Sequence, residues 1–317
     1  MKRQKAEFFT IFIMSFPSLT TTYHRDTYPS ISPTKQSLSQ ADKTVLITGG
    51  GVGLGFEIAR SFAKASASRI IIVGRRSELL DDAVTKLREE FKVGTEFISH
   101  QGDIGDDSSV ATLWEFLHSW NIFVHVLVLN AAALSPLVPD TLAMNKQELM
   151  DMFNVNLGGN FLMSAKFVQQ PLRPTGQQLY LLNVSTGGIH QNPALSQNSY
   201  ATSKAAFTAL IGRVADEHPV DDVQIISFHP GILYSEGAAK LFDKSVFKWE
   251  EMALPADFSV WAASPEASWL HGRFVWASWD VDELKADFLK QIEKESGFLK
   301  VGVEGLKSAS LEPYLNK

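Results

Sequence analysis

A buried strand, a glycine-rich turn and a helix follow one another near the beginning of the chain. Residues 43–48 form a short apolar run rich in β-branched side chains, which is typical of a strand buried on both faces. Five glycines fall within Gly49–Gly55, and residues 56–66 then carry apolar side chains at helical spacing. The backbone N–H groups and the dipole at the start of such a helix favour a phosphate. The context therefore predicts a phosphate-binding turn, and an ordinary glycine loop is the alternative.

Strand and helix patterns alternate along the rest of the chain. Short apolar runs predict further strands at residues 69–73, 95–99, 124–129, 178–184, 223–228 and 272–277. Helical spacing predicts helices at residues 77–90, 108–120, 145–170, 200–218, 257–263 and from 281 onward. This alternation indicates βαβ units with right-handed crossovers. The expected fold is α/β: a doubly wound, Rossmann-type parallel sheet of seven strands in a single domain.

The length limits how the chain divides into domains. It has 317 residues, of which 45% are hydrophobic and 20% charged, as is ordinary for a globular protein. This size favours one domain of roughly 250 residues with extensions over two equal domains. We expect that domain at residues 41–280. We expect a disordered or draped arm at residues 1–40 and a C-terminal extension at residues 281–317.

Charge and residue usage exclude several classes of function. The net charge of −6, without a basic run, argues against a general nucleic-acid binder. The chain has no cysteine, which excludes disulfides, cysteine-ligated zinc and a thiol nucleophile. No metal site is predicted.

The N-terminal residues 2–16 resemble a weak signal peptide, because basic side chains precede a short apolar run. No small-residue cleavage site follows closely, and the run is too short to span a membrane. We favour a disordered tail or an upstream start codon, with Met14 as an alternative first residue. The prediction is a cytoplasmic protein without stable membrane insertion.

Tyr200 and Lys204 are the residues most suited to acid–base chemistry. Residues four apart lie on one face of a helix, so the phenol and the ammonium can meet. A neighbouring cation favours the phenolate, and so predicts a Tyr200 pKa below its usual value of about 10. The pair would form a proton donor, and a surface pair on a helix is the alternative.

Arg75 follows the second predicted strand, where an acidic residue would hold the ribose hydroxyls of NAD. An arginine suits a 2′-phosphate instead, so NADP(H) is the predicted cofactor. A solvated basic pair with Arg76 is the alternative.

Over residues 43–280 the chain resembles the short-chain dehydrogenase/reductase superfamily. The resemblance rests on Thr48-Gly-x-x-x-Gly-x-Gly55, Asn130-Ala-Ala-Ala133, Tyr200-x-x-x-Lys204 and Pro230-Gly231 with Ser235. It implies a nicotinamide cofactor held by the following residues: Thr48, Gly49, Gly51, Gly53, Leu54, Gly55, Arg75, Asp103, Asn130, Tyr200, Lys204, Pro230, Gly231, Leu233 and Ser235.

The same resemblance implies a catalytic set of Asn156, Thr186, Tyr200 and Lys204. Thr186 stands where the family usually has serine, and Ser185 is the weaker candidate for that role. In the implied reaction, NADPH gives a hydride to a carbonyl carbon and Tyr200 gives a proton to its oxygen. Lys204 would lower the Tyr200 pKa and bind the nicotinamide ribose, Thr186 would orient the carbonyl, and Asn156 would hold a relay water. The alternative function is a redox sensor that binds NADP(H) without turnover.

The segment 232–257 corresponds to the substrate lid of the family. Its aromatic side chains indicate an apolar or ring-containing substrate, although packing explains them equally well. They are Tyr234, Phe242, Phe247 and Trp249. We expect His190 and His229 to be structural or solvent-facing. Packing roles are expected for Trp261, Trp269, Trp276 and Trp279.

Helices 145–170 and 200–218 look like the pair through which family members dimerise, so a homodimer or homotetramer is expected. The arm and tail resemble those of fungal members that act in the biosynthesis of small secondary metabolites. A small carbonyl or alcohol is the expected partner.

Overall fold

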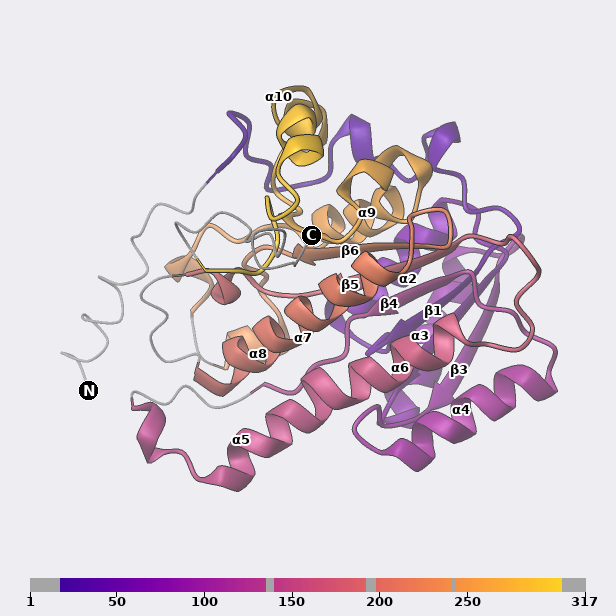
Figure 1. Ribbon diagram of the computed structural model, residues 1–317. Coiled ribbons are helices and arrows are strands. Elements are labelled where there is room, and N and C mark those ends of the chain that lie inside the picture. The colour runs from indigo at the N-terminus through magenta and orange to yellow at the C-terminus, as the bar shows by residue number, and fades with distance from the viewer. Residues whose placement is uncertain (1–17, 135–139, 192–197, 241–242, 304–317) are drawn as a thin grey trace, which may run out of the picture.

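The computed structural model describes residues 18–134, 140–191, 198–240 and 243–303. One parallel sheet of seven strands runs in the order β3-β2-β1-β4-β5-β6-β7, which confirms the predicted fold (Figure 1). The direction of strand addition reverses between β1 and β4, and this makes their carboxyl ends a topological switch point. The strands are β1 (Thr44–Thr48), β2 (Arg69–Gly74), β3 (Glu96–Gln101), β4 (Val126–Leu129), β5 (Leu179–Val184), β6 (Val223–His229) and β7 (Arg273–Trp276).

Helices cover both faces of the sheet, and each face has its own core. Because side chains alternate along a strand, Val45 and Ile47 of β1 join the core under α2, α3 and α9, while Leu46 joins the core under α4, α6 and α7. The principal helices are α2 (Gly53–Lys64), α3 (Ser77–Glu90), α4 (Asp107–Ser119), α5 (Lys146–Phe153), α6 (Asn160–Val168), α7 (Asn198–Glu217), α8 (Glu236–Ala239), α9 (Ala253–Ala262) and α10 (Val281–Lys294).

A π-helical turn at Asn154–Gly159 interrupts the helix that the sequence predicted at residues 145–170. The backbone continues through it from α5 into α6 (Figure 1). The turn lies against the loop after β3, where a Cβ on Gly159 would come 2.2 Å from the Ile104 carbonyl oxygen. The sequence prediction did not include this turn, because π-helical turns are rare and helical spacing is read as a continuous α-helix.

Helix α9 begins at Ala253, whereas the sequence predicted irregular structure up to residue 257. Pro255 lies in the first turn of this helix. A proline is tolerated in the first turn of a helix, where its missing N–H would have no intrahelical partner.

The described part of the N-terminal arm, residues 18–40, lies beside α9 and α10 (Figure 1). Ile31 and Leu38 are fully buried. Tyr23 forms an antiparallel bridge with Trp279, and the Tyr28 hydroxyl donates to the Trp279 carbonyl oxygen at 3.1 Å. The signal-like segment with Met14 and the last part of the predicted extension, residues 304–317, lie outside the described residues.

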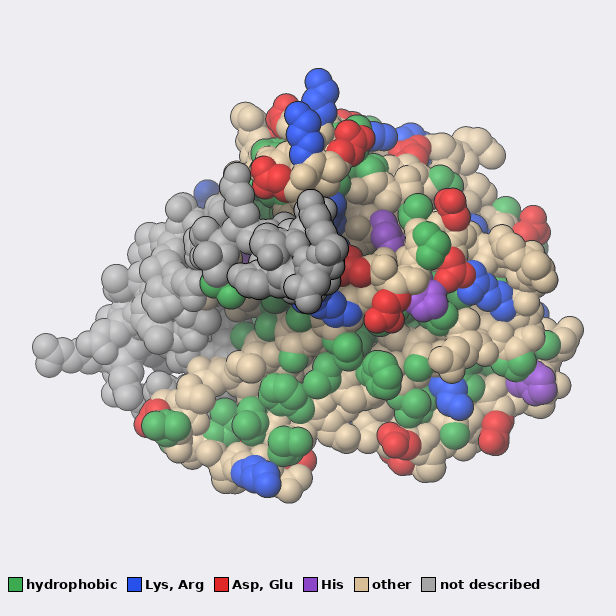
Figure 2. Space-filling view, in the orientation of Figure 1, with side chains coloured by type: hydrophobic (Ala, Val, Ile, Leu, Met, Phe, Trp, Pro, Cys, Tyr) green, Lys and Arg blue, Asp and Glu red, His purple; other side chains and the backbone are tan. Residues whose placement is uncertain are grey.

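The described surface carries several exposed hydrophobic side chains. Leu149 and Met150 of α5 and Phe161 of α6 are among them, and Figure 2 shows hydrophobic side chains gathered over α5, α6 and α7. Within residues 18–303, apart from the undescribed gaps, no helix has both the length and the apolar character needed to cross a membrane.

Candidate active site

The turn after β1 is joined to the end of β4 by a compact set of hydrogen bonds. The Thr48 hydroxyl oxygen accepts from the backbone N–H groups of Asn130 and Ala131 at 3.1 and 3.0 Å. The Asn130 amide donates to the carbonyl oxygens of Thr48 and Gly49 at 3.0 and 3.3 Å. Both side chains therefore hold the turn in place, and their contacts with a cofactor stay a prediction.

The glycines of this turn let the backbone come very close to itself. A Cβ on Gly55 would lie 2.2 Å from the Gly49 carbonyl oxygen, and Gly49 and Gly53 have φ values of 68° and 55°. Helix α2 begins here, and Val52 at its N-cap makes no side-chain capping bond. The first-turn N–H groups thus receive no side-chain cap, and the turn fits the phosphates of a dinucleotide.

Arg75 and Asp103 follow the neighbouring strands β2 and β3. The Gly49 N–H donates to the Val73 carbonyl oxygen at 2.7 Å, which holds the glycine turn beside the end of β2. The exposed Arg75 lies two residues further on. The Asp103 carboxylate accepts from the Gly105 N–H at 2.9 Å and so closes its own loop.

Lys204 lies deep in the structure and ties α7 to the end of β5. Only 2% of this residue is exposed, and its Nζ donates to the Val184 carbonyl oxygen at 2.6 Å. Ser185 is also buried, and its hydroxyl shares a 2.8 Å hydrogen bond with Thr208 of α7. Thr186, the next residue, is half-buried, and its hydroxyl oxygen caps a short 3₁₀ turn by accepting from the Gly188 N–H at 3.3 Å. Of the two hydroxyls, the one on Thr186 is therefore the more accessible.

The pKa of Tyr200 is shifted in the direction opposite to the sequence prediction. Burial raises it to about 12, and burial lowers the pKa of Lys204 to about 8. The predicted lowering by Lys204 is wrong for this chain because the ammonium is bonded to the Val184 carbonyl and its charge does not offset the desolvation of the phenol.

Asn156 lies in the π-helical turn and is fully buried. Its amide donates to the Ala133 carbonyl oxygen and to the Ser203 hydroxyl, both at 3.0 Å, and its Oδ1 accepts from the Ala133 N–H at 2.8 Å. The Ser203 hydroxyl in turn donates to the Tyr200 carbonyl oxygen at 2.8 Å. Asn156 thus joins the loop after β4 to α7 beside Tyr200, and the water relay stays a prediction.

The turn after β6 contains Pro230 and Gly231, and Gly231 has a φ of 98°. A Cβ on Gly231 would lie 3.1 Å from Cγ of Glu250, whose carboxylate accepts from the Ile232 N–H at 2.7 Å. Leu233 forms a parallel bridge with Glu250. A buried acid therefore supports this turn.

Ser235 uses its side chain locally, because its hydroxyl oxygen caps α8 by accepting from the Ala238 N–H at 3.2 Å. The lid aromatics pack against one another: the Trp249 ring lies 5.0 Å from the Tyr234 ring and 5.1 Å from the Phe247 ring. Phe242, the fourth predicted lid aromatic, lies outside the described residues.

His190 and His229 both contact Trp276. The Trp276 indole N–H donates to Nε2 of His190 at 3.0 Å, and the His229 ring packs edge-on at 4.4 Å. Burial lowers the pKa of His229 to about 3, so this imidazole is neutral. Trp261, Trp276 and Trp279 are buried in the core, as expected.

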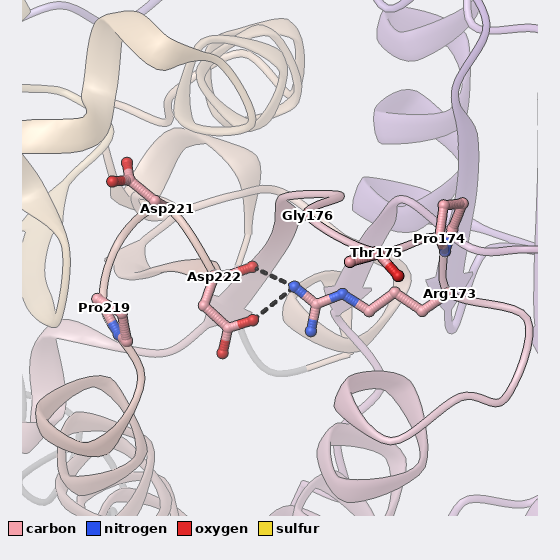
Figure 3. A pocket seen from close by; sticks show the side chains of 7 residues that line it. All are labelled: Arg173, Pro174, Thr175, Gly176, Pro219, Asp221 and Asp222. Atoms are coloured by element: carbon pink, nitrogen blue, oxygen red, sulfur yellow. Dashed lines mark hydrogen bonds and ion pairs between the residues drawn. The ribbon is translucent and has the colours of Figure 1, made fainter.

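A surface pocket lies at the other edge of the sheet, in the loops that precede β5 and β6. Arg173 and Asp222 form an ion pair of 2.5 Å within it (Figure 3). Ligands of open α/β sheets bind at the carboxyl ends of the strands, so this pocket is separate from the candidate active site. Its lining consists of Arg173, Pro174, Thr175, Gly176, Pro219, Asp221 and Asp222.

Sequence reasoning missed Ser203 and Glu250. Ser203 directly precedes Lys204 on a buried helix face, and a hydroxyl at such a position is a signal that could have been used. Glu250 carried no comparable signal, because one acidic residue in an irregular segment is normally solvated.

Comparisons with known proteins agree with this geometry. A family model described as short chain dehydrogenase matches residues 43–245. The short chain dehydrogenase/reductase nsrO of Aspergillus novofumigatus is 35% identical over 291 residues, with 90% of this chain and 97% of that relative covered. A short chain dehydrogenase/reductase of Claviceps purpurea is 33% identical over 296 residues, with 93% and 97% covered.

Solved structures share the fold. A short chain dehydrogenase of Shigella flexneri complexed with NADP has a TM-score of 0.67 at 21% identity, covering 77% of this chain and 99% of that one. A Pseudomonas aeruginosa RhlG/NADP active-site complex has a TM-score of 0.68 at 17% identity, covering 76% and 96%. Such identities show the fold alone, whereas the family model and the fungal relatives establish the membership. The chain belongs to the short-chain dehydrogenase/reductase family.

Proposed function

We propose that this protein is an NADP(H)-dependent carbonyl reductase, in which Tyr200 protonates the carbonyl oxygen of a small metabolite. The observation that carries the proposal is the placement of Lys204. This buried ammonium is bonded to the end of β5 beside Thr186, and it lies one helical turn from Tyr200. The glycine turn stands at the same edge of the sheet.

The proton chemistry follows from the raised pKa of Tyr200. NADPH, when bound, supplies the hydride that reduces the carbonyl carbon. At neutral pH a phenol with a pKa of about 12 is protonated. This is the form in which Tyr200 can give its proton to the more basic oxygen on which negative charge develops during hydride transfer. The Thr186 hydroxyl would donate a hydrogen bond to that oxygen and hold it beside Tyr200. Lys204 would hold the nicotinamide ribose.

The cofactor proposal rests on the fit of the turn after β1. Gly55 packs tightly against the Gly49 backbone, while no atom lies within 4 Å of a Cβ on Gly53, so the backbone there is open to the approach of a pyrophosphate. The exposed Arg75 suits a 2′-phosphate. Two solved structures with a similar fold are complexes with NADP. Arg75→Asp should therefore weaken NADPH binding about tenfold and leave NADH binding nearly unchanged, as measured by fluorescence titration.

The lid aromatics support an apolar or ring-containing substrate. The fungal relatives support a role in the metabolism of small secondary products. The exposed hydrophobic side chains of α5 and α6 support a homodimer or homotetramer. We place the protein in the cytoplasm, on the prediction that residues 2–16 are not a signal peptide.

Tyr200→Phe tests the proposed acid directly. NADPH oxidation with a panel of ketones and quinones should fall about 10³-fold, while the Kd for NADPH stays unchanged. Tyr180→Phe is the matched control, because the Tyr180 hydroxyl bonds to Gln178 at the opposite end of β5 and should leave turnover unaffected. Retained turnover in Tyr200→Phe would contradict the assignment of Tyr200 as the proton donor. NADPH binding by the wild type without turnover on any member of the panel would favour the redox sensor.

The two neighbouring hydroxyls can be told apart by mutation. Thr186→Ala should lower kcat about 10²-fold, and Thr186→Ser should restore it, because only the donor is needed. Ser185→Ala should leave kcat within about threefold and lower the free energy of unfolding by about 1 kcal/mol, since its hydrogen bond to Thr208 is lost. The reverse pattern would transfer the role to Ser185.

A further inference from the structure

Glu250 is a buried carboxylate that joins three separate parts of the chain. Only 4% of the residue is exposed. Its Oε2 accepts from the Ile232 N–H at 2.7 Å, directly after the Pro230–Gly231 turn. Its Oε1 accepts from the Tyr23 hydroxyl at 3.0 Å and from the Arg25 guanidinium at 2.9 Å. One oxygen thus holds the turn after β6 and the other holds the N-terminal arm.

The arm reaches this carboxylate in a defined conformation. The Arg25 guanidinium also donates to the Lys248 carbonyl oxygen at 2.5 Å and lies 5.2 Å from the centre of the Tyr23 ring. The Glu251 N–H donates to the Arg25 carbonyl oxygen at 2.7 Å. The Arg25 side chain therefore holds Lys248 before Glu250, and the Arg25 backbone holds Glu251 after it.

A buried carboxylate is costly unless it is paired and hydrogen-bonded. Burial raises the pKa of Glu250 even with its partners in place. Loss of the arm contacts would leave one oxygen without its donors, and the carboxylate would then shift toward water and release the Ile232 N–H. The position of the turn after β6 therefore depends on the arm.

We propose that Tyr23, Arg25 and Glu250 form an arm clamp, a set of positioning residues that fixes the backbone of Gly231 and Ile232 for cofactor binding. The proposal rests on the proposed NADP(H)-dependent function, which gives this turn its ligand. All three clamp residues lie outside residues 43–245, the part of the chain that the family model matches. The clamp thus joins the N-terminal arm to a segment beyond the matched range.

Hydrogen–deuterium exchange on the full-length chain tests the clamp without relying on activity. The double variant Tyr23→Phe, Arg25→Ala should raise the exchange rates of the Ile232 and Glu250 amides about tenfold, because each amide is bonded within the clamped pair. Amides of β1 should keep their rates. The Arg25 side chain is 46% exposed and Tyr23→Phe removes one hydroxyl, so the variant is expected to fold.

Ser30→Ala is the matched control, since this arm residue bonds to Asp282 of α10 and does not touch Glu250. It should leave both amides unchanged. Arg25→Lys, which keeps a charged donor, should give intermediate rates. Wild-type exchange at Ile232 and Glu250 in the double variant overturns the proposal. An equal rise at the Val281 amide, which donates to the Tyr28 hydroxyl of the arm, also overturns it, because the arm would then merely have come loose.

NADPH titration then links the clamp to function. The double variant should bind NADPH about fivefold more weakly and Ser30→Ala as tightly as the wild type. Raised exchange with unchanged NADPH affinity would contradict the positioning role. If the wild type binds no NADPH, the proposed function fails while the exchange result still decides whether the clamp exists.

Discussion

Two glycine turns at the same edge of the sheet, after β1 and after β6, are held in different ways. The turn after β1 is fixed by its own backbone and by Asn130 at the end of β4. The turn after β6 is fixed by Glu250, which lies 18 residues beyond Ile232 in the sequence. Glu250 is itself bonded to Tyr23 of the arm, 227 positions away.

One edge of the sheet therefore combines a rigid turn with an adjustable one. At Gly55 the nearest atom is the Gly49 carbonyl oxygen, and this backbone cannot move without unfolding the turn. At Gly231 the neighbouring atoms belong to the Glu250 side chain, which can change its rotamer. The turn after β1 should therefore tolerate substitution far less than the turn after β6.

The largest effect is expected for Gly55→Ala. The new Cβ would lie 2.2 Å from the Gly49 carbonyl oxygen and 2.6 Å from the Asn130 amide nitrogen. The free energy of unfolding should fall by about 4 kcal/mol in a urea titration, and NADPH binding should be lost. Gly53→Ala is the control, because its φ of 55° is strained but no atom lies within 4 Å, and it should cost only about 1 kcal/mol. Equal losses would show that backbone strain, and not crowding, limits this turn.

A smaller effect is expected for Gly231→Ala, which should lower the free energy of unfolding by about 3 kcal/mol. A φ of 98° is unfavourable for alanine, and the new Cβ would lie 3.1 Å from Cγ of Glu250. Part of this loss of stability comes from crowding of the new Cβ against the Glu250 side chain. Combination with Glu250→Ala should therefore be less destabilising than the sum of the single variants by about 1 kcal/mol. Gly176→Ala, at a φ of 76° in open space, measures the strain alone. Strict additivity in the double variant would argue against an adjustable turn.

The smallest effect concerns Lys204, which lies on the element between the two turns. Its pKa is about 8 in the folded chain, whereas an exposed lysine, as in the unfolded chain, has a pKa of 10.5. Between pH 8 and pH 10.5 the Lys204 amine therefore holds its proton more fully in the unfolded chain than in the folded one. The stability of the folded state should therefore rise with pH through this window. From pH 7 to pH 10 the wild type should gain about 2 kcal/mol relative to Lys204→Met, measured by urea unfolding.

Lys43, whose pKa burial also lowers to about 8, is present in both proteins and cancels in that difference. A flat difference across this pH range would mean that Lys204 is as well solvated in the folded chain as in the unfolded one.

Much of the site could be predicted because its residues follow strand ends. Alternating strands and helices place the carboxyl ends of β1, β4, β5 and β6 along one edge, which brings the glycine turn, Asn130 and Thr186 to that edge. The choice between Ser185 and Thr186 follows from the same regularity. Neighbouring residues point to opposite sides of an extended chain, so when Ser185 meets α7, Thr186 points away from it.

The pKa of Tyr200 could not be predicted in the same way. Helical spacing states that residues four apart share a face, but it does not say where a long ammonium side chain ends. The Val184 carbonyl decides that, and the burial of the phenol then decides the direction of the shift. The π-helical turn at Asn156 has a similar origin, because it accompanies an amide bonded to a loop from another strand.

The sheet, the glycine turn and the family could be predicted from the sequence, because local periodicity and spacing encode which backbone conformations are allowed. The support that the arm gives to the turn after β6 could not, because it depends on contacts between distant segments. A buried carboxylate is stable only where donors surround it, and the donors of Glu250 come from segments that folding alone brings together.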